Sequence, residues 1–62
     1  MNDRMLDAVT TAVRMYRGAY TMPEALSYAT VTHNLDEFEQ EDLPVIVNNQ
    51  LARLKLQLGE NF

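Results

Sequence analysis

The sequence predicts an all-α protein, a small three-helix bundle that leaves room for a short extra helical turn near residues 35–41. Three stretches repeat their apolar residues at the spacing of an amphipathic helix. Residues that end or begin helices separate them: Gly18 and Pro23 between the first two, and Gly59 after the last. No stretch alternates apolar and polar residues as a half-buried strand does. The 62 residues are expected to form a single helical domain, residues 1–62.

The first helix is expected to begin at Asn2 or Asp3, either of which can cap it, and to run to about Arg17 or Ala19. Gly18 is a suitable C-terminal cap for this helix. Its apolar residues fall on one face. These residues are Met5, Leu6, Val9, Ala12, Val13, Tyr16 and Tyr20.

The second helix is expected to start with a reciprocal capping box between Thr21 and Glu24. Tyr28 and Val31 fall outside its narrow apolar stripe and are expected to face a third surface. The stripe comprises Met22, Ala25, Leu26 and Ala29. His33 follows at the end of this helix, where a histidine is favourable near the negative end of the helix dipole. No proton partner for catalysis is visible beside it in the sequence.

An acidic segment, residues 36–42, precedes the last helix and holds five acids in seven residues. Asn34 and Glu37 are a second candidate capping box, which would start a short turn that carries Leu35 and Phe38 inward. Metal ligands and a mimic of nucleic-acid phosphates are alternatives, although the central glycine of an EF-hand is absent. The simplest interpretation is a solvated connection that places negative charge ahead of the next helix.

The last helix is expected over residues 43–58, and it has two apolar stripes rather than one. The first stripe comprises Leu43, Val47, Leu51, Leu54 and Leu58, with Ile46 at its edge. We expect it to form the core together with Val9, Val13, Tyr16 and Leu26. The second stripe, Val45, Asn49, Ala52 and Leu56, lies nearly opposite and has the spacing of a coiled-coil seam. Its residues either remain in water, as many apolar residues do, or contact a second copy or a partner helix.

Composition excludes several kinds of site. There is no cysteine and one histidine, so neither a disulfide nor a structural zinc site can form, and no metal or cofactor is expected. No apolar run reaches the ~20 residues of a membrane span, and the first residues do not resemble a signal peptide, so a cytoplasmic protein is expected. A chain this short gains stability from a second subunit, which favours a homodimer.

The net charge of −4 comes entirely from residues 32–62, where six acids face Arg53 and Lys55. This balance disfavours tight binding to nucleic acid and favours a protein partner with a basic surface. Asp36, Glu37 and Glu39 are the acidic residues expected to contact it.

Catalytic motifs are not found in the sequence. The only glycines, Gly18 and Gly59, form no phosphate-binding loop, and no nucleophile has a base at a recognisable spacing. A helix-turn-helix DNA-binding protein is the alternative, because the last helix carries polar and basic side chains suited to reading bases. These are Asn48, Asn49, Gln50, Arg53 and Lys55. The neighbouring acidic segment would repel DNA.

Residues 12–23 resemble the end of the first helix and the following turn in the theta subunit of bacterial DNA polymerase III. Tyr16, Arg17 and the run Tyr20-Thr21-Met22-Pro23 match that family's aromatic, basic and Tyr-Asn-Met-Pro positions. The last helix also resembles that family's last helix in its leucine spacing, after an insertion that contains most of the acidic segment. The family's basic C-terminal part is absent. The resemblance implies an accessory subunit that binds and steadies a proofreading exonuclease.

The helix layout is also similar to that of the small Hha-type nucleoid modulators, although their Asp-His-Arg signature is absent. From the sequence we expect a non-enzymatic helical interaction protein, of bacterial or phage type, that binds and modulates a larger protein. A DNA-binding or nucleoid-modulating regulator is the alternative function. The expected partner-binding residues are Val45, Asn49, Ala52 and Leu56 on the seam and Asp36, Glu37 and Glu39 in the acidic segment.

Overall fold

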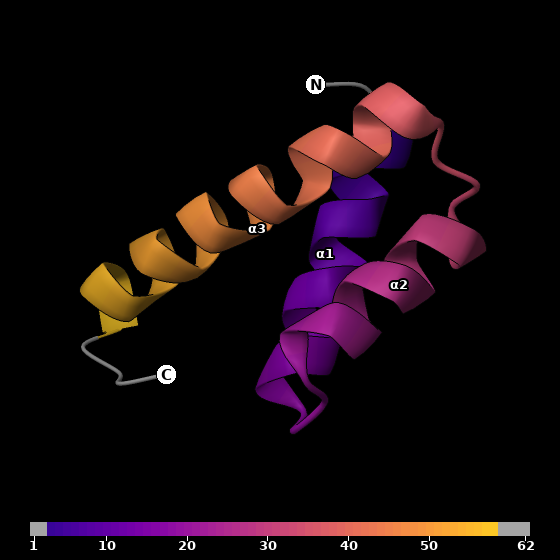
Figure 1. The fold of residues 1–62 in the computed structure, drawn as a ribbon. Coiled ribbons are helices and arrows are strands. Elements are labelled where there is room, and N and C mark those ends of the chain that lie inside the picture. Colours follow the sequence, from indigo (N-terminus) through magenta and orange to yellow (C-terminus); the bar gives the residue numbers. More distant parts are fainter. Residues whose placement is uncertain (1–2, 59–62) are drawn as a thin grey trace.

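A computed structural model describes residues 3–58, and for Leu58 it describes the backbone alone. Within this range the chain forms three helices: α1 (Asp3–Arg17), α2 (Met22–Thr32) and α3 (Glu37–Leu58). The predicted all-α three-helix bundle is thereby confirmed. In Figure 1, α1 and α2 lie side by side and run in opposite directions, and α3 crosses them near the start of α1. The last turns of α3, drawn orange to yellow, extend away from the other two helices.

Four of the buried side chains of α1 and α2 are alanines. Ala8 and Ala12 of α1 and Ala25 and Ala29 of α2 are completely buried. An alanine lets two helix backbones approach closely, so this pair packs as a tight unit. The other buried residues are Met5, Val9, Val13, Leu35, Leu43, Val47 and Leu51.

The predicted core is largely confirmed. Val9, Val13, Val47 and Leu51 are buried, and three further predicted residues pack against them while partly exposed. These three are Tyr16, Leu26 and Leu54. The side chain of Leu58 lies outside the described residues. Tyr28 and Val31 are exposed, as expected for residues outside the stripe of α2.

Two residues predicted on the buried face of α1, Leu6 and Tyr20, are more than half exposed. The buried face is instead rotated toward Ala8, an alanine that contributes little to an apolar pattern. Tyr20 leaves the helical line because Ala19 adopts a left-handed conformation with φ 83°. The amide of Tyr20 donates to the carbonyl of Met15 at 3.1 Å, which completes a Schellman ending. The left-handed residue is therefore Ala19 rather than Gly18.

α2 ends in the same way, which corrects the expected role of Asn34. This residue has φ 52°, and the amide of Leu35 donates to the carbonyl of Thr30 at 3.0 Å. Asn34 therefore terminates α2 and does not cap a following turn. The next residue, Leu35, is buried as expected, whereas Phe38 is 78% exposed and does not point inward.

The acidic segment is helical from Glu37 onward rather than a connecting loop, although most of its acids are exposed to solvent. α3 begins at Glu37, six residues before the expected start, so the helical turn expected near residues 35–41 is the beginning of α3 itself. Asp36 and Glu39 form its capping box: the Glu39 amide donates to Asp36 Oδ1 at 2.8 Å, and the Asp36 amide donates to Glu39 Oε1 at 3.0 Å. Pro44 consequently lies inside the helix, where it cannot donate to the carbonyl of Gln40.

The capping box predicted at the start of α2 is present. The Glu24 amide donates to Thr21 Oγ1 at 3.3 Å, and the Thr21 amide and hydroxyl donate to Glu24 Oε1 at 3.1 Å and 2.8 Å. Donation from the Thr21 backbone, and then from its hydroxyl, lowers the pKa of Glu24 below its ordinary value of 4.5. The ionised form is therefore favoured in the folded chain.

A lowered pKa makes α2 sensitive to acid. The capping box should contribute stability above the ordinary pKa of glutamate and lose it as the pH falls through the lower folded value. Glu24→Gln keeps a side-chain acceptor for Thr21 but removes the titration. Thermal melts of both chains between neutral pH and pH 3 should show the melting temperature of wild type falling more steeply. Parallel curves would contradict the role assigned to Glu24.

Candidate interaction surface

α3 presents two opposite faces, and only one of them packs on the bundle. Leu43 and Val47, which are 1% and 0% exposed, mark the face toward α1 and α2. About 180° around the helix lies the predicted seam. All four of its residues are exposed, with Val45 at 61% and Leu56 at 85%. The four residues are Val45, Asn49, Ala52 and Leu56. The structure thus aligns the predicted seam residues along one exposed face.

The longer α3 extends this seam toward its beginning. Phe38 lies seven residues before Val45, and Asp42 lies between them at the same three-and-four spacing. Both are exposed. Phe38 was missed as a surface residue because a short inward turn was expected at this point. In the sequence, its seven-residue spacing from Val45 was the signal that could have placed it on the same exposed face. We refer to Phe38, Asp42, Val45, Asn49, Ala52 and Leu56 as the α3 seam.

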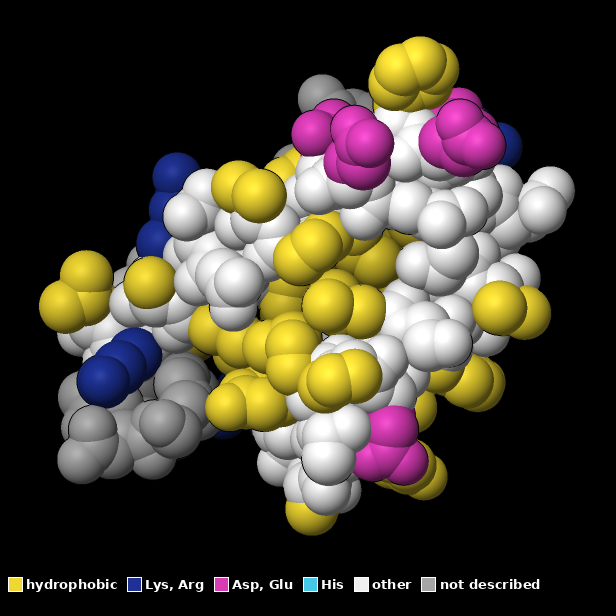
Figure 2. Space-filling view, in the orientation of Figure 1, with side chains coloured by type: hydrophobic (Ala, Val, Ile, Leu, Met, Phe, Trp, Pro, Cys, Tyr) yellow, Lys and Arg dark blue, Asp and Glu magenta, His cyan; other side chains and the backbone are white. Residues whose placement is uncertain are grey.

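Charges along the α3 seam are segregated. Glu41 flanks its beginning, and Arg53 and Lys55 flank its end; all three are exposed. Figure 2 shows acidic side chains over the first turns of α3 and Lys or Arg side chains over its last turns. The seam therefore has an acidic end and a basic end.

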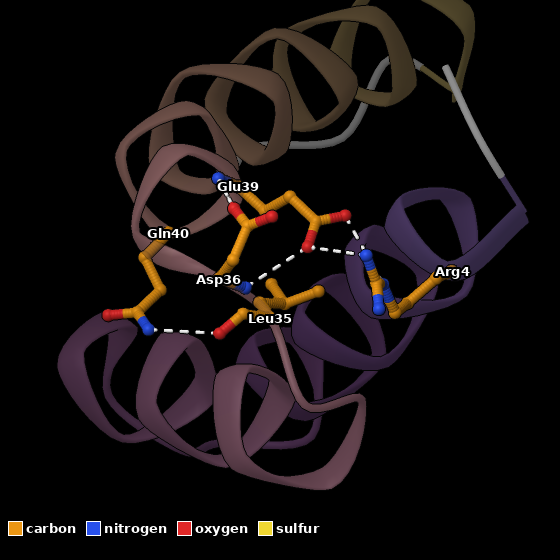
Figure 3. A network of polar contacts seen from close by, with 5 residues as sticks. All are labelled: Arg4, Leu35, Asp36, Glu39 and Gln40. Carbon is orange, nitrogen blue, oxygen red and sulfur yellow. Dashed lines mark hydrogen bonds and ion pairs between the residues drawn. The ribbon is translucent and has the colours of Figure 1, made fainter.

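Two of the three acids expected to contact a partner have roles within the fold (Figure 3). Asp36 and Glu39 cap α3, and Glu39 also pairs with Arg4 of α1 at 2.9 Å between Oε1 and Nη2. The Glu39 side chain is only 12% exposed. Gln40 adds a third link by donating from Nε2 to the Leu35 carbonyl at 3.0 Å. The cap and the Gln40 bond fix the first turn of α3, and the Arg4–Glu39 pair holds it against α1, whereas Glu37 is exposed.

His33 has a partner that the sequence did not reveal. Its Nε2 lies 2.7 Å from Thr11 Oγ1, and both side chains are partly buried. The pair joins the end of α2 to the middle of α1.

Two hollows on the described part of the surface include residues of α1. One, of about 260 Å³, lies between α1 and α3 and includes Leu6, Val13 and Ile46. The other, of about 630 Å³, is open and lies over α2, with Tyr20 and Tyr28 in its wall. Figure 2 also shows hydrophobic side chains in the depression between α2 and α3. The first two hollows are mostly apolar, and neither is lined by a residue of the α3 seam.

The arrangement of α2 and α3 bears on the helix-turn-helix alternative. Residues 33–36 connect the two helices, a length typical of that motif. A recognition helix places its N-terminal residues against the bases. In α3 those residues include Glu37, Glu39 and Glu41, which would face the phosphates with negative charge.

Comparisons with protein-family models, with curated proteins and with solved structures found no match. Residues 3–58 contain no group of three or more His, Cys, Asp or Glu side chains arranged to hold a metal ion. None of the described helices is both long enough and apolar enough to cross a membrane.

Proposed function

We propose that this protein is a non-enzymatic interaction module that binds another protein chain through the α3 seam. The observation that carries the proposal is the second apolar face of α3. Phe38, Val45 and Leu56 project from a continuous helix, directly opposite the residues that fill the core. An apolar face at coiled-coil spacing matches the way one helix recognises another.

The use of charge in this proposal differs from the sequence-based expectation. Asp36 and Glu39 cap α3, so their replacement would disturb the fold as well as any contact. Glu41 is exposed beside the α3 seam and is the better candidate to meet a basic surface, whereas Glu37, which is also exposed, lies away from the seam. Such charges at the edge of an interface act mainly on the rate of association.

An accessory subunit in the cytoplasm of a bacterium, or of a cell infected by a phage, is one form of this proposal. It rests on the short match to the theta family from Tyr16 to Pro23. In the structure this stretch spans the end of α1, the Schellman turn and the start of α2. Tyr20 is exposed there and lines the larger hollow. The interaction module does not depend on this match, since the seam lies on another helix.

Photo-crosslinking in the native cell tests the proposal. A photoreactive amino acid at position 48 would lie beside the α3 seam without replacing a seam residue, because Asn48 is exposed. The same amino acid at Asp7, an exposed position on α1, is the matched control. We expect covalent adducts to a protein chain from position 48 and few from position 7. Equal yields at both positions, or none from position 48, would refute an interaction through this face.

A further inference from the structure

We propose that the occupant of the α3 seam is a second copy of this chain, with the two α3 helices packed antiparallel. This inference rests on the proposed function and names the partner. It follows from a symmetry in the seam, from the charges that flank it and from the position of the rest of the bundle.

The α3 seam is self-complementary when one copy is reversed. Phe38 and Leu56 each lie nine residues from Val47, so an antiparallel pair centred on Val47 places Phe38 of one copy against Leu56 of the other. The same centre puts Val45 against Asn49 of the second copy. Phe38 and Leu56 are 78% and 85% exposed, and each would cover the other. Burying such side chains is the main source of affinity for a helix pair.

The flanking charges also pair only in the antiparallel arrangement. Glu41 and Lys55 occupy equivalent edge positions of the heptad pattern, positions that face each other across an antiparallel coiled coil. Two such ion pairs form in a symmetric dimer. Asp42 would face Ala52 of the second copy, with Arg53 of that copy beside it. In a parallel dimer, Asp42 would instead face the Asp42 of the second copy, and the two carboxylates would repel each other.

Packing within each copy is compatible with this dimer. The seam lies opposite the core face of Leu43 and Val47, so α1 and α2 of the two copies would lie on the outer sides of the helix pair. All residues of the α3 seam are exposed, so no other part of residues 3–58 covers this face. The dimer does not require a contact from Glu39, because this carboxylate is already paired with Arg4 of the same copy.

The seam is short, so the dimer is expected to be weak. From Phe38 to Leu56 the helix rises about 27 Å, which places the interface at the small end of specific protein contacts. Asn49 in the seam lowers the affinity further, because a polar residue at such a position costs stability. We therefore expect a reversible dimer that forms between tens and hundreds of micromolar.

Sedimentation equilibrium of the purified chain with charge-reversed variants tests this proposal. We expect wild type to dimerise, and Leu56→Glu to raise the dissociation constant more than about tenfold by placing a charge in the seam. Glu41→Lys and Lys55→Glu should each raise it about threefold to tenfold, since each replaces two attractions by two repulsions. The double variant restores opposite charges in the antiparallel pair, so its affinity should return to within about twofold of wild type.

Glu37→Lys is the matched control, with the same charge change on the same helix but away from the seam, and circular dichroism confirms that each variant is folded. A wild-type chain that stays monomeric at hundreds of micromolar would overturn the inference. A double variant no tighter than the single variants would overturn the antiparallel arrangement. If the purified chain is monomeric while position 48 crosslinks to a different protein, this inference fails and the interaction module stands. If no adduct forms from position 48 either, both fail.

Discussion

Leu43→Ala is expected to lower the free energy of unfolding by about 2–5 kcal/mol, enough to unfold much of so small a chain. Leu43 is among the largest fully buried side chains of the described residues, and it lies one turn before Val47 on the core face of α3. Its removal would leave a cavity where the start of α3 meets α1. It would also weaken the helix beside Pro44, where a backbone hydrogen bond is already missing.

The matched control is Leu56→Ala, the same change on the outer face of the same helix. At concentrations where the chain is monomeric, it should change stability by no more than about 0.5 kcal/mol. Urea denaturation followed by circular dichroism measures both variants. Equal losses for the two variants would show that the core face and the seam of α3 have been wrongly assigned.

Ala29→Leu is expected to destabilise the chain by about 1–3 kcal/mol, because a larger side chain cannot fit between α1 and α2. Ala29 is completely buried, and it belongs to the contact formed by Ala8, Ala12 and Ala25. The added atoms would force these two backbones apart. Since α1 also carries the core residues that contact α3, the whole bundle would be disturbed.

Ala52→Leu is the control for this substitution, because Ala52 is exposed on the α3 seam. The stability of the monomer should be nearly unchanged, while the larger apolar side chain should strengthen any contact made by the seam. Thermal melts at low and high protein concentration separate the two effects. A large loss for Ala52→Leu, or none for Ala29→Leu, would contradict the proposed packing.

Local signals were sufficient to predict much of this fold. The capping box of Thr21 and Glu24 depends on residues three apart, and the spacing of Val47 and Leu51 places both on one helix face. The start of α3 was harder to predict, because Asn34–Glu37 and Asp36–Glu39 are both plausible capping boxes. The structure selects the second, since Asn34 is already used to end α2.

The candidate interface was predicted in part, for a related reason. Val45 and Leu56 could be assigned to the outer face of the last helix from periodicity alone. Phe38 has the matching seven-residue spacing from Val45, but this spacing is informative only if α3 is known to begin before residue 38. The pairing of Arg4 with Glu39 joins residues 35 apart in the sequence and depends on the crossing of α1 and α3. Long-range contacts of this kind have no local signature.

The most direct test of the antiparallel dimer is a distance between two copies of one spin label. The chain contains no cysteine, so Glu37→Cys gives a single labelling site at the exposed start of α3. Position 37 lies ten residues from the centre at Val47, which places the two labels about 30 Å apart along the antiparallel pair. Pulsed electron paramagnetic resonance at a protein concentration of hundreds of micromolar should show a distance between the two labels of about 30 Å or more. Labels closer than about 20 Å would indicate parallel helices, which pack with axes about 8–10 Å apart, and would contradict the account.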